Sequence, residues 1–244
     1  MNFDKETAFD LIRSNIASHG RHVYVVAGDG PLPRFAYTIG VRDRIGVELV
    51  LAGASIFQAN EVTHIINHIA SKLQIDEAQR DKNYDLGSLG RFSLRPTDPS
   101  WTSGLMLGAL DYYKVISLQV LQIVPDDLHM TIDTPDLARH WNASEQPVWQ
   151  WLYTPWTLDV PPTSKAITNM SALKGKRITE AARWETNQWE LFSGAGSDVA
   201  TGEARVVPLG TLLAVDATLM VVTHLDIGRA IWRDSERDDW RAWN

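Results

Sequence analysis

Three short β-rich runs between residues 21 and 53 constrain the fold of this chain more than any other feature. The runs RHVYVV, RFAYTIGV and GVELVLAG are separated by segments that contain glycine, and the pattern predicts a meander of three strands. Helical patterns flank the runs over residues 4–18 and 55–73, and Ser55 is the expected N-cap of the second helix. The order helix, meander, helix predicts an α+β fold with helices packed on an antiparallel sheet, rather than alternating βαβ units.

The rest of the chain adds strands and then a second unit. After a polar loop, GRFSLRP and the run YYKVISLQVLQIVP are both expected to be strands. Three prolines interrupt the periodic pattern in TPWTLDVPPTSK, at residues 154–165. We therefore predict an N-terminal domain over residues 1–160 and a second, smaller α+β domain over residues 165–244, with one helix near residues 207–215.

Composition excludes several classes of site and partner. The 244 residues include no cysteine, which excludes disulfides, thiolate nucleophiles and zinc–thiolate centres. The net charge of −7 argues against sequence-independent nucleic-acid binding and is compatible with a basic protein partner. The acidity belongs mainly to residues 1–162, which have 13 Lys and Arg against 19 Asp and Glu, whereas residues 163–244 have 10 against 11.

Neither a membrane span nor a secretory leader is expected. No stretch approaches the run of about 18 apolar residues that a spanning helix needs. The N-terminal sequence MNFDKETAFDLIRSN lacks a basic region followed by an apolar one. We expect a cytoplasmic protein with no membrane partner and no nucleic-acid partner.

The stretch PRFAYTIGV combines a strand pattern with two polar side chains. Strand alternation places Phe35, Tyr37 and Ile39 on one face and Ala36 and Thr38 on the other. Tyr37 is then expected in the core, where its hydroxyl needs a buried partner. The alternative is that Tyr37 and Thr38 lie at the rim of a binding cleft.

Two histidine-containing patterns are candidate sites for metal or acid–base chemistry. His64 and His68 are four residues apart on a predicted helix and could share a metal ion, or they could belong to an exposed polar face. Asp126 and Asp127 precede His129 at the end of a predicted strand and could act in acid–base chemistry, or they could form an ordinary turn. No phosphate-binding loop, dinucleotide motif or Gly-x-Ser-x-Gly motif is present, so no cofactor is expected.

Ten tryptophans are a further candidate for function. Tryptophan is a common anchor of protein interfaces, although tryptophans can equally hold small layers together. Trp189, Trp240 and Trp243 are the expected binding residues among them, and the two in DDWRAWN have charged neighbours at the C-terminus.

The first part of the chain resembles the bacterial family catalogued as domain of unknown function 4262. The resemblance covers roughly residues 5–130 and includes FAYTIG, the preceding SHGRHVYVVAGDG and the later VLQIVPDD. The matching positions are His19, Gly20, Phe35, Tyr37, Thr38, Gly40, Glu48, Leu49, Leu121, Gln122, Pro125 and Asp126. Val47 stands where the family has a proline, and the family has no established activity to transfer to this chain.

The last part, about residues 165–240, is similar to a small domain once catalogued as unknown-function 2185 and grouped with toxin-immunity proteins. The matching residues are Trp189, Phe192, Ser193, Gly194 and Gly228. This resemblance implies an immunity protein that occludes the active surface of a toxin domain.

These observations lead to two main functional hypotheses, and the third alternative is a stand-alone ligand sensor that uses the cleft of the second. The first is a cytosolic protein-binding protein, with an immunity protein as its specific form and a basic toxin domain as its partner. The second is a small enzyme, with or without a metal, whose cleft contains Tyr37, His64 and Asp126. The residues expected to bind are Tyr37, Thr38, Asp126, Asp127, Trp189, Trp240 and Trp243.

Overall fold

A computed structural model describes residues 5–28, 30–76, 80–234, 237 and 239–243 of the chain. The α-helices are α1 (Lys5–His19), α2 (Arg42–Ile45), α3 (Ala59–Ile75), α4 (Pro99–Leu105), α5 (Leu107–Tyr113), α6 (Met170–Leu173) and α7 (Leu209–Leu213). The strands are β1 (His22–Val26), β2 (Phe35–Ile39), β3 (Glu48–Ala52), β4 (Tyr84–Asp85), β5 (Arg91–Pro96), β6 (Val120–Pro125), β7 (Lys165–Asn169), β8 (Glu180–Glu185), β9 (Gln188–Phe192), β10 (Ala204–Pro208), β11 (Arg229–Trp232) and β12 (Arg241–Ala242). Short 3₁₀ helices are η2 (Gly87–Leu89), η3 (Pro147–Leu152), η4 (Gly196–Asp198), η5 (Thr201–Glu203) and η6 (Ala217–His224).

The first sheet contains the predicted meander. Its strand order is β1-β2-β3-β6-β5-β4, and β1, β2 and β3 pair antiparallel in sequence order. The expectation of a wholly antiparallel sheet is corrected at one place, because β3 and β6 run parallel. Between β3 and β6 the chain forms α3, β4, β5, α4 and α5, and β6 then lies between β3 and β5. The parallel pair makes the sheet mixed.

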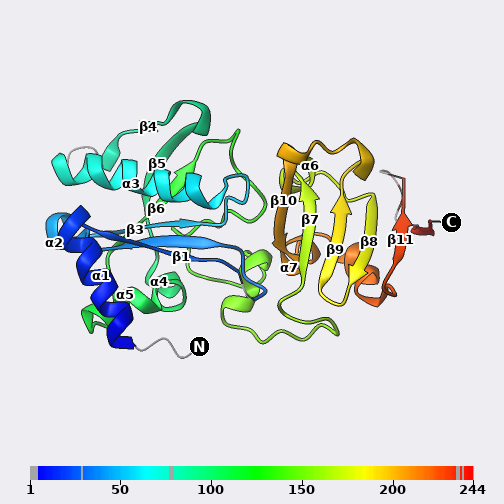
Figure 1. The fold of residues 1–244 in the computed structure, drawn as a ribbon, viewed down its shortest axis with the longest axis horizontal. Coiled ribbons are helices and arrows are strands. Elements are labelled where there is room, and N and C mark those ends of the chain that lie inside the picture. The colour runs from blue at the N-terminus through cyan, green and yellow to red at the C-terminus, as the bar shows by residue number, and fades with distance from the viewer. Residues whose placement is uncertain (1–4, 29, 77–79, 235–236, 238, 244) are drawn as a thin grey trace.

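Helices cover both faces of the first sheet (Figure 1). The apolar stripe of α3 packs on one face, in a core cluster that also includes Leu49 and Leu51 of β3. On the other face, Phe35 and Tyr37 of β2 pack with Trp101 of α4 and with apolar residues of α5 and η3. Every residue of β2 and β3 is consequently buried.

The second helix begins later than predicted. α3 begins at Ala59 and not near Ser55, and the carboxylate of Glu61 accepts a hydrogen bond of 2.7 Å from the backbone N–H of Gln58. The hydroxyl of Ser55 instead donates to the buried carboxylate of Asp133 at 2.5 Å. A contact with a residue far along the chain therefore overrides the local capping pattern.

The prediction of one long strand at YYKVISLQVLQIVP is wrong. Its first residues end α5, and Lys114 stops this helix in the left-handed conformation with φ +54°. Only Val120–Pro125 forms β6. The predicted loop after α3 also contains a short paired strand, β4, whose Tyr84 is buried.

The second sheet has the order β10-β7-β9-β8-β11-β12, with β7 and β9 parallel and the other neighbours antiparallel. Its core cluster includes apolar residues of α6, α7 and η6 on one face. The helix predicted near residues 207–215 is α7. The α+β class is therefore confirmed. Each proposed domain, 1–160 and 165–244, contains one sheet, and the division into these domains stays a prediction.

The two parts are in contact. Nε of Arg205 donates to the carbonyl of Ile56 at 2.9 Å, and the N–H of Ile132 donates to the carbonyl of Leu173 at 2.9 Å. Among the described residues, the helices include none with the length and apolar character that a membrane span requires.

Candidate functional site

Tyr37 lies in the core and not at a cleft rim. It is 2% exposed and stacks on Tyr24 with ring centroids 5.4 Å apart. A Cβ atom added to Gly108 of α5 would lie 2.5 Å from the Tyr37 hydroxyl oxygen, so the α5 backbone closes over this hydroxyl. Burial raises the pKa of Tyr37, and Tyr24 adds to this, while a hydrogen bond from the Gly108 backbone opposes it.

Thr38 belongs to a buried cluster centred on the carboxylate of Glu48. The Thr38 hydroxyl donates to Oε2 of Glu48 at 2.5 Å. Oε1 accepts from the N–H groups of Gly40 and Arg42 and from the hydroxyl of Tyr113, at 2.9, 3.1 and 2.5 Å. Burial raises the pKa of Glu48, although these hydrogen bonds lower it in part. The cluster joins the end of β2 to the start of β3, and its Thr38 and Glu48 are fully buried.

The two histidines of α3 lie on its outer side. The rings of His64 and His68 are 6.3 Å apart, and His64 is exposed. Burial lowers the pKa of His68, as do the nearby Lys72 and His64. The described residues contain no group of three or more His, Cys, Asp or Glu that could hold a metal ion.

Asp126 and His129 form a pair within a turn. Oδ1 of Asp126 lies 2.6 Å from Nδ1 of His129, and Oδ2 accepts the N–H of Arg91 at 2.8 Å. Burial favours the neutral acid, but the hydrogen bonds from Arg91 and His129 outweigh it and lower the pKa of Asp126. The His129 ring also stacks on Phe57 at 5.7 Å. Asp127 is exposed in the same turn.

The structure does not bring Tyr37, His64 and Asp126 into one cleft. Tyr37 packs on the face of the first sheet that α4 and α5 cover. The helix that carries His64 packs on the opposite face, and Asp126 follows the end of β6.

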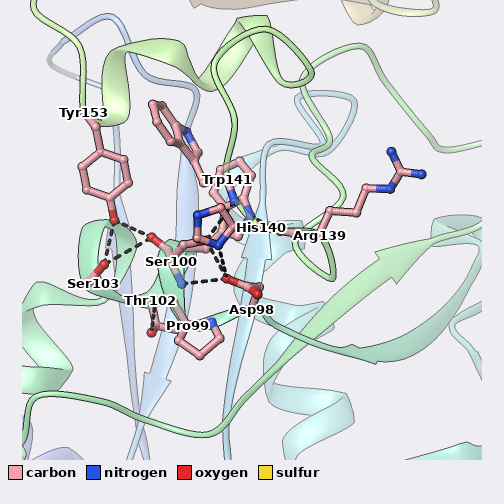
Figure 2. A network of polar contacts seen from close by, with 10 residues as sticks. Asp98, Pro99, Ser100, Thr102, Ser103, Arg139, His140, Trp141 and Tyr153 are labelled. Carbon is pink, nitrogen blue, oxygen red and sulfur yellow. Dashed lines mark hydrogen bonds and ion pairs between the residues drawn. The ribbon is translucent and has the colours of Figure 1, made fainter.

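Figure 2 shows a further polar network, at the start of α4. Asp98 accepts from the N–H and the hydroxyl of Ser100 at 2.9 and 2.6 Å, and Nδ1 of His140 lies 3.3 Å away. The Ser100 hydroxyl thus donates to the carboxylate and not to the histidine, which is not the order of a nucleophile, base and orienting acid. It also accepts the N–H of Trp141 at 2.8 Å, and the Tyr153 hydroxyl donates to the Ser100 carbonyl. The network caps α4 and ties the η3 segment to it.

The tryptophans proposed as binding anchors have different environments. Trp189 is in the core beneath the second sheet, where its indole N–H donates to the carbonyl of Val222, so it is not a surface anchor. Trp240 is half-buried against the guanidinium of Arg233. Trp243 is 53% exposed. Trp184, which the sequence did not single out, is 51% exposed.

The helices α6, α7 and η6 pack on one face of the second sheet, and we call the opposite face the open face (Figure 1). Strand register places one residue from each of five neighbouring strands in a row across this face. The row is Val206, Ile167, Glu190, Ala182 and Ala230. Val206 is 64% exposed and Ile167 is 38% exposed, so the face is both apolar and accessible.

Trp184 stands between two hollows of the open face. The first, of about 640 Å³, contains Ala182, Glu190, Phe192 and Trp243 in its wall. The second, of about 560 Å³, includes Ile167. The carboxylate of Glu190 makes no hydrogen bond or ion pair with any residue that the structure describes, and it lies within an apolar row.

Residues 15–130 match the family described as Domain of unknown function (DUF4262). This match covers the first sheet, from the end of α1 to the turn after β6, and includes Tyr37, Thr38 and Glu48. The resemblance of residues 165–240 to a toxin-immunity domain has no counterpart in this comparison. No curated protein matches the chain. No solved structure matches it.

Proposed function

We propose that this chain is a cytosolic binding protein whose open face takes a basic protein partner. The observation that carries the proposal is the carboxylate of Glu190, which pairs with no described residue although it lies in the middle of an apolar, exposed row. A Lys or Arg of the partner would satisfy this carboxylate while neighbouring apolar groups fill the hollows beside Trp184.

Charge favours this occupant over a second copy of the chain. The chain has a net charge of −7, most of it on residues 1–162, so two copies repel each other as whole molecules, whereas a basic protein is attracted. The expected binding residues are Trp184, Glu190 and Trp243, each of which lies at the wall of the first hollow.

An immunity protein is the specific form of this proposal that the resemblance of residues 165–240 implies. In this form the open face covers the active surface of a toxin domain, and the chain needs no catalytic residues of its own. The test is to titrate the purified product of the neighbouring gene against this chain. Tight binding that suppresses its toxicity would support this form, and no binding would overturn it without affecting the general proposal.

The general proposal is tested with a phage-displayed library of random peptides selected on the intact chain. Selected peptides should contain a Lys or Arg beside aromatic or apolar residues. Synthetic copies should bind Trp184→Ala at least about thirtyfold more weakly than wild type, and Glu190→Gln about tenfold more weakly. Ile116→Ala, which removes a fully exposed apolar side chain of the first part, should bind as wild type does.

Three outcomes would overturn the proposal. They are an absence of selected peptides, selected peptides without a cation, and equal binding to Trp184→Ala and wild type. A concentration-dependent dimer that Trp184→Ala dissociates would instead identify a second copy as the occupant.

A further inference from the structure

A third hollow, which differs in chemistry from the two on the open face, lies in the cleft between the two parts of the chain. It has a volume of about 400 Å³ and is walled by both parts. Its polar and charged wall residues are Arg34, Ser55, Gln58, Lys165 and Arg205. Three of these side chains are cationic, and neither part alone supplies all three.

Backbone carbonyls hold the two guanidinium groups close together. Nη2 of Arg34 donates to the carbonyl of Phe57 at 2.5 Å, and Nε of Arg205 donates to the adjacent carbonyl of Ile56 at 2.9 Å. Burial lowers the pKa of Arg34; Asp133 opposes this, and the charge of Arg205 lowers it further. Two like charges are thus fixed near each other, an arrangement that an anion between them would stabilise.

The charges of the three cations in the cleft are not neutralised by ion pairs within the described residues. Arg34, Arg205 and Lys165 form no ion pair with any residue in the described part of the chain. Nε of Arg34 is buried and has no hydrogen-bond partner. Lys165 is exposed at the wall of the cleft.

The nearby carboxylates are already engaged by neutral donors. The Asp133 carboxylate accepts from the Ser55 hydroxyl and from the Thr131 hydroxyl, both at 2.5 Å. The Glu61 carboxylate accepts the N–H of Gln58. Gln58 and Ala59 also place the N-terminus of the 17-residue helix α3 at the wall of the cleft, which adds positive potential there.

We infer that this cleft binds a small molecule through a phosphate group, with Arg34, Arg205 and Lys165 as its cationic ligands. Three cations line the cleft against the two carboxylates whose charges act on Arg34, Asp133 and Glu61, so positive charge is in excess there. Phosphate is the anionic group that paired guanidiniums and a helix N-terminus bind well. Because the cations come from both parts of the chain, the bound phosphate would also stabilise the contact between them.

The inference is tested by calorimetric titration of the intact chain with inorganic phosphate and, separately, with glycerol phosphate, at constant ionic strength. Each should bind at one saturable site. Lys165→Gln should weaken binding about fivefold, because it removes an exposed cation whose ammonium makes no hydrogen bond or ion pair with the described residues. Arg34→Met should weaken it more than about thirtyfold.

The matched control is Lys174→Gln, which removes an exposed lysine outside the cleft and should bind phosphate as wild type does. Tighter binding of glycerol phosphate than of inorganic phosphate identifies an ester as the ligand, and the reverse identifies free phosphate. An absence of saturable binding by both probes would overturn the inference, as would equal binding by Lys165→Gln and wild type. Lys165→Gln decides the question even if Arg34→Met does not fold.

Discussion

The two sheets of this chain are buried in different ways, although both have six strands and one parallel pair. In the first sheet, β2 and β3 are buried at every position because helices pack on both faces. In the second sheet, β7 alternates between exposed and buried positions up to Ile167. The first sheet is therefore enclosed on both faces, whereas the second sheet has an exposed apolar surface on one face.

The difference between burial on two faces and burial on one is visible in the sequences of the strands. FAYTI and ELVLA are mainly apolar, as in strands that are buried on both faces, whereas KAITN and QWELF place polar residues between apolar ones. The two polar residues of the first pair, Thr38 and Glu48, satisfy each other inside the core. The polar residue at the centre of QWELF, Glu190, has no such partner among the described residues.

The largest effect should come from Leu51→Ala on β3. Leu51 is fully buried beneath α3, and truncating such a side chain to alanine leaves a cavity. We expect the free energy of unfolding to fall by about 2–5 kcal/mol. Urea denaturation measures the change, and a loss below about 1 kcal/mol would contradict two-faced burial of this strand.

Glu48→Gln should change how stability depends on pH. Burial raises the pKa of Glu48 in the folded state above its ordinary value of 4.5. Wild type should therefore lose stability as the pH rises from the ordinary pKa to the raised one, because the folded state retains a proton that the unfolded state releases. Glutamine resembles the protonated acid and does not titrate, so the variant should lack this loss.

Denaturation over a pH series measures the difference in the free energy of unfolding between Glu48→Gln and wild type. As the pH rises, this difference should grow in favour of the variant by at most about 1.4 kcal/mol per pH unit. A difference that stays constant above pH 4.5, or grows in favour of wild type, would show that the carboxylate is not destabilised by burial.

Tyr37→Phe should reduce stability by about 1 kcal/mol, because it removes a buried hydroxyl that the Gly108 backbone contacts. Thermal or urea denaturation measures the change, and binding of the selected peptides should be unaffected. If stability were unchanged and peptide binding were lost, Tyr37 would belong to the binding site after all.

The smallest effect should come from Ile167→Ala on the open face. Ile167 is partly exposed and opposite Val206 and Glu190, so its truncation should change the free energy of unfolding by no more than about 0.5 kcal/mol. The same change should weaken peptide binding. A stability loss similar to that of Leu51→Ala would mean that this face is covered.

Local pattern predicted the meander, the apolar stripe of α3 and the α+β class, because each depends on the periodicity of neighbouring residues. It failed at Tyr112 and Tyr113, where aromatic residues favour a strand locally but end a helix that packs on the first sheet. It also failed at Ser55, whose hydrogen-bond partner Asp133 is 78 residues away.

The candidate sites were less predictable than the fold. His64, His68 and Asp126 were suggested by spacing alone, and the structure does not assemble them into a site with Tyr37. Glu190 and Trp184 belong to no sequence motif, and their exposure depends on which face of the second sheet the helices cover. The sequence alone therefore did not identify them. The alternation in KAITN and QWELF was the signal that could have indicated an open face.

The accessibility of the open face is tested most directly by thiol reactivity, because the chain has no cysteine of its own. Ile167→Cys and Leu51→Cys each introduce one thiol, which is titrated with a thiol-specific disulfide reagent in the folded protein. The thiol at position 167 should react at the rate of a free thiol, whereas the thiol at position 51 should react only on unfolding. Protection at position 167 in the isolated chain would contradict the accessibility of the open face.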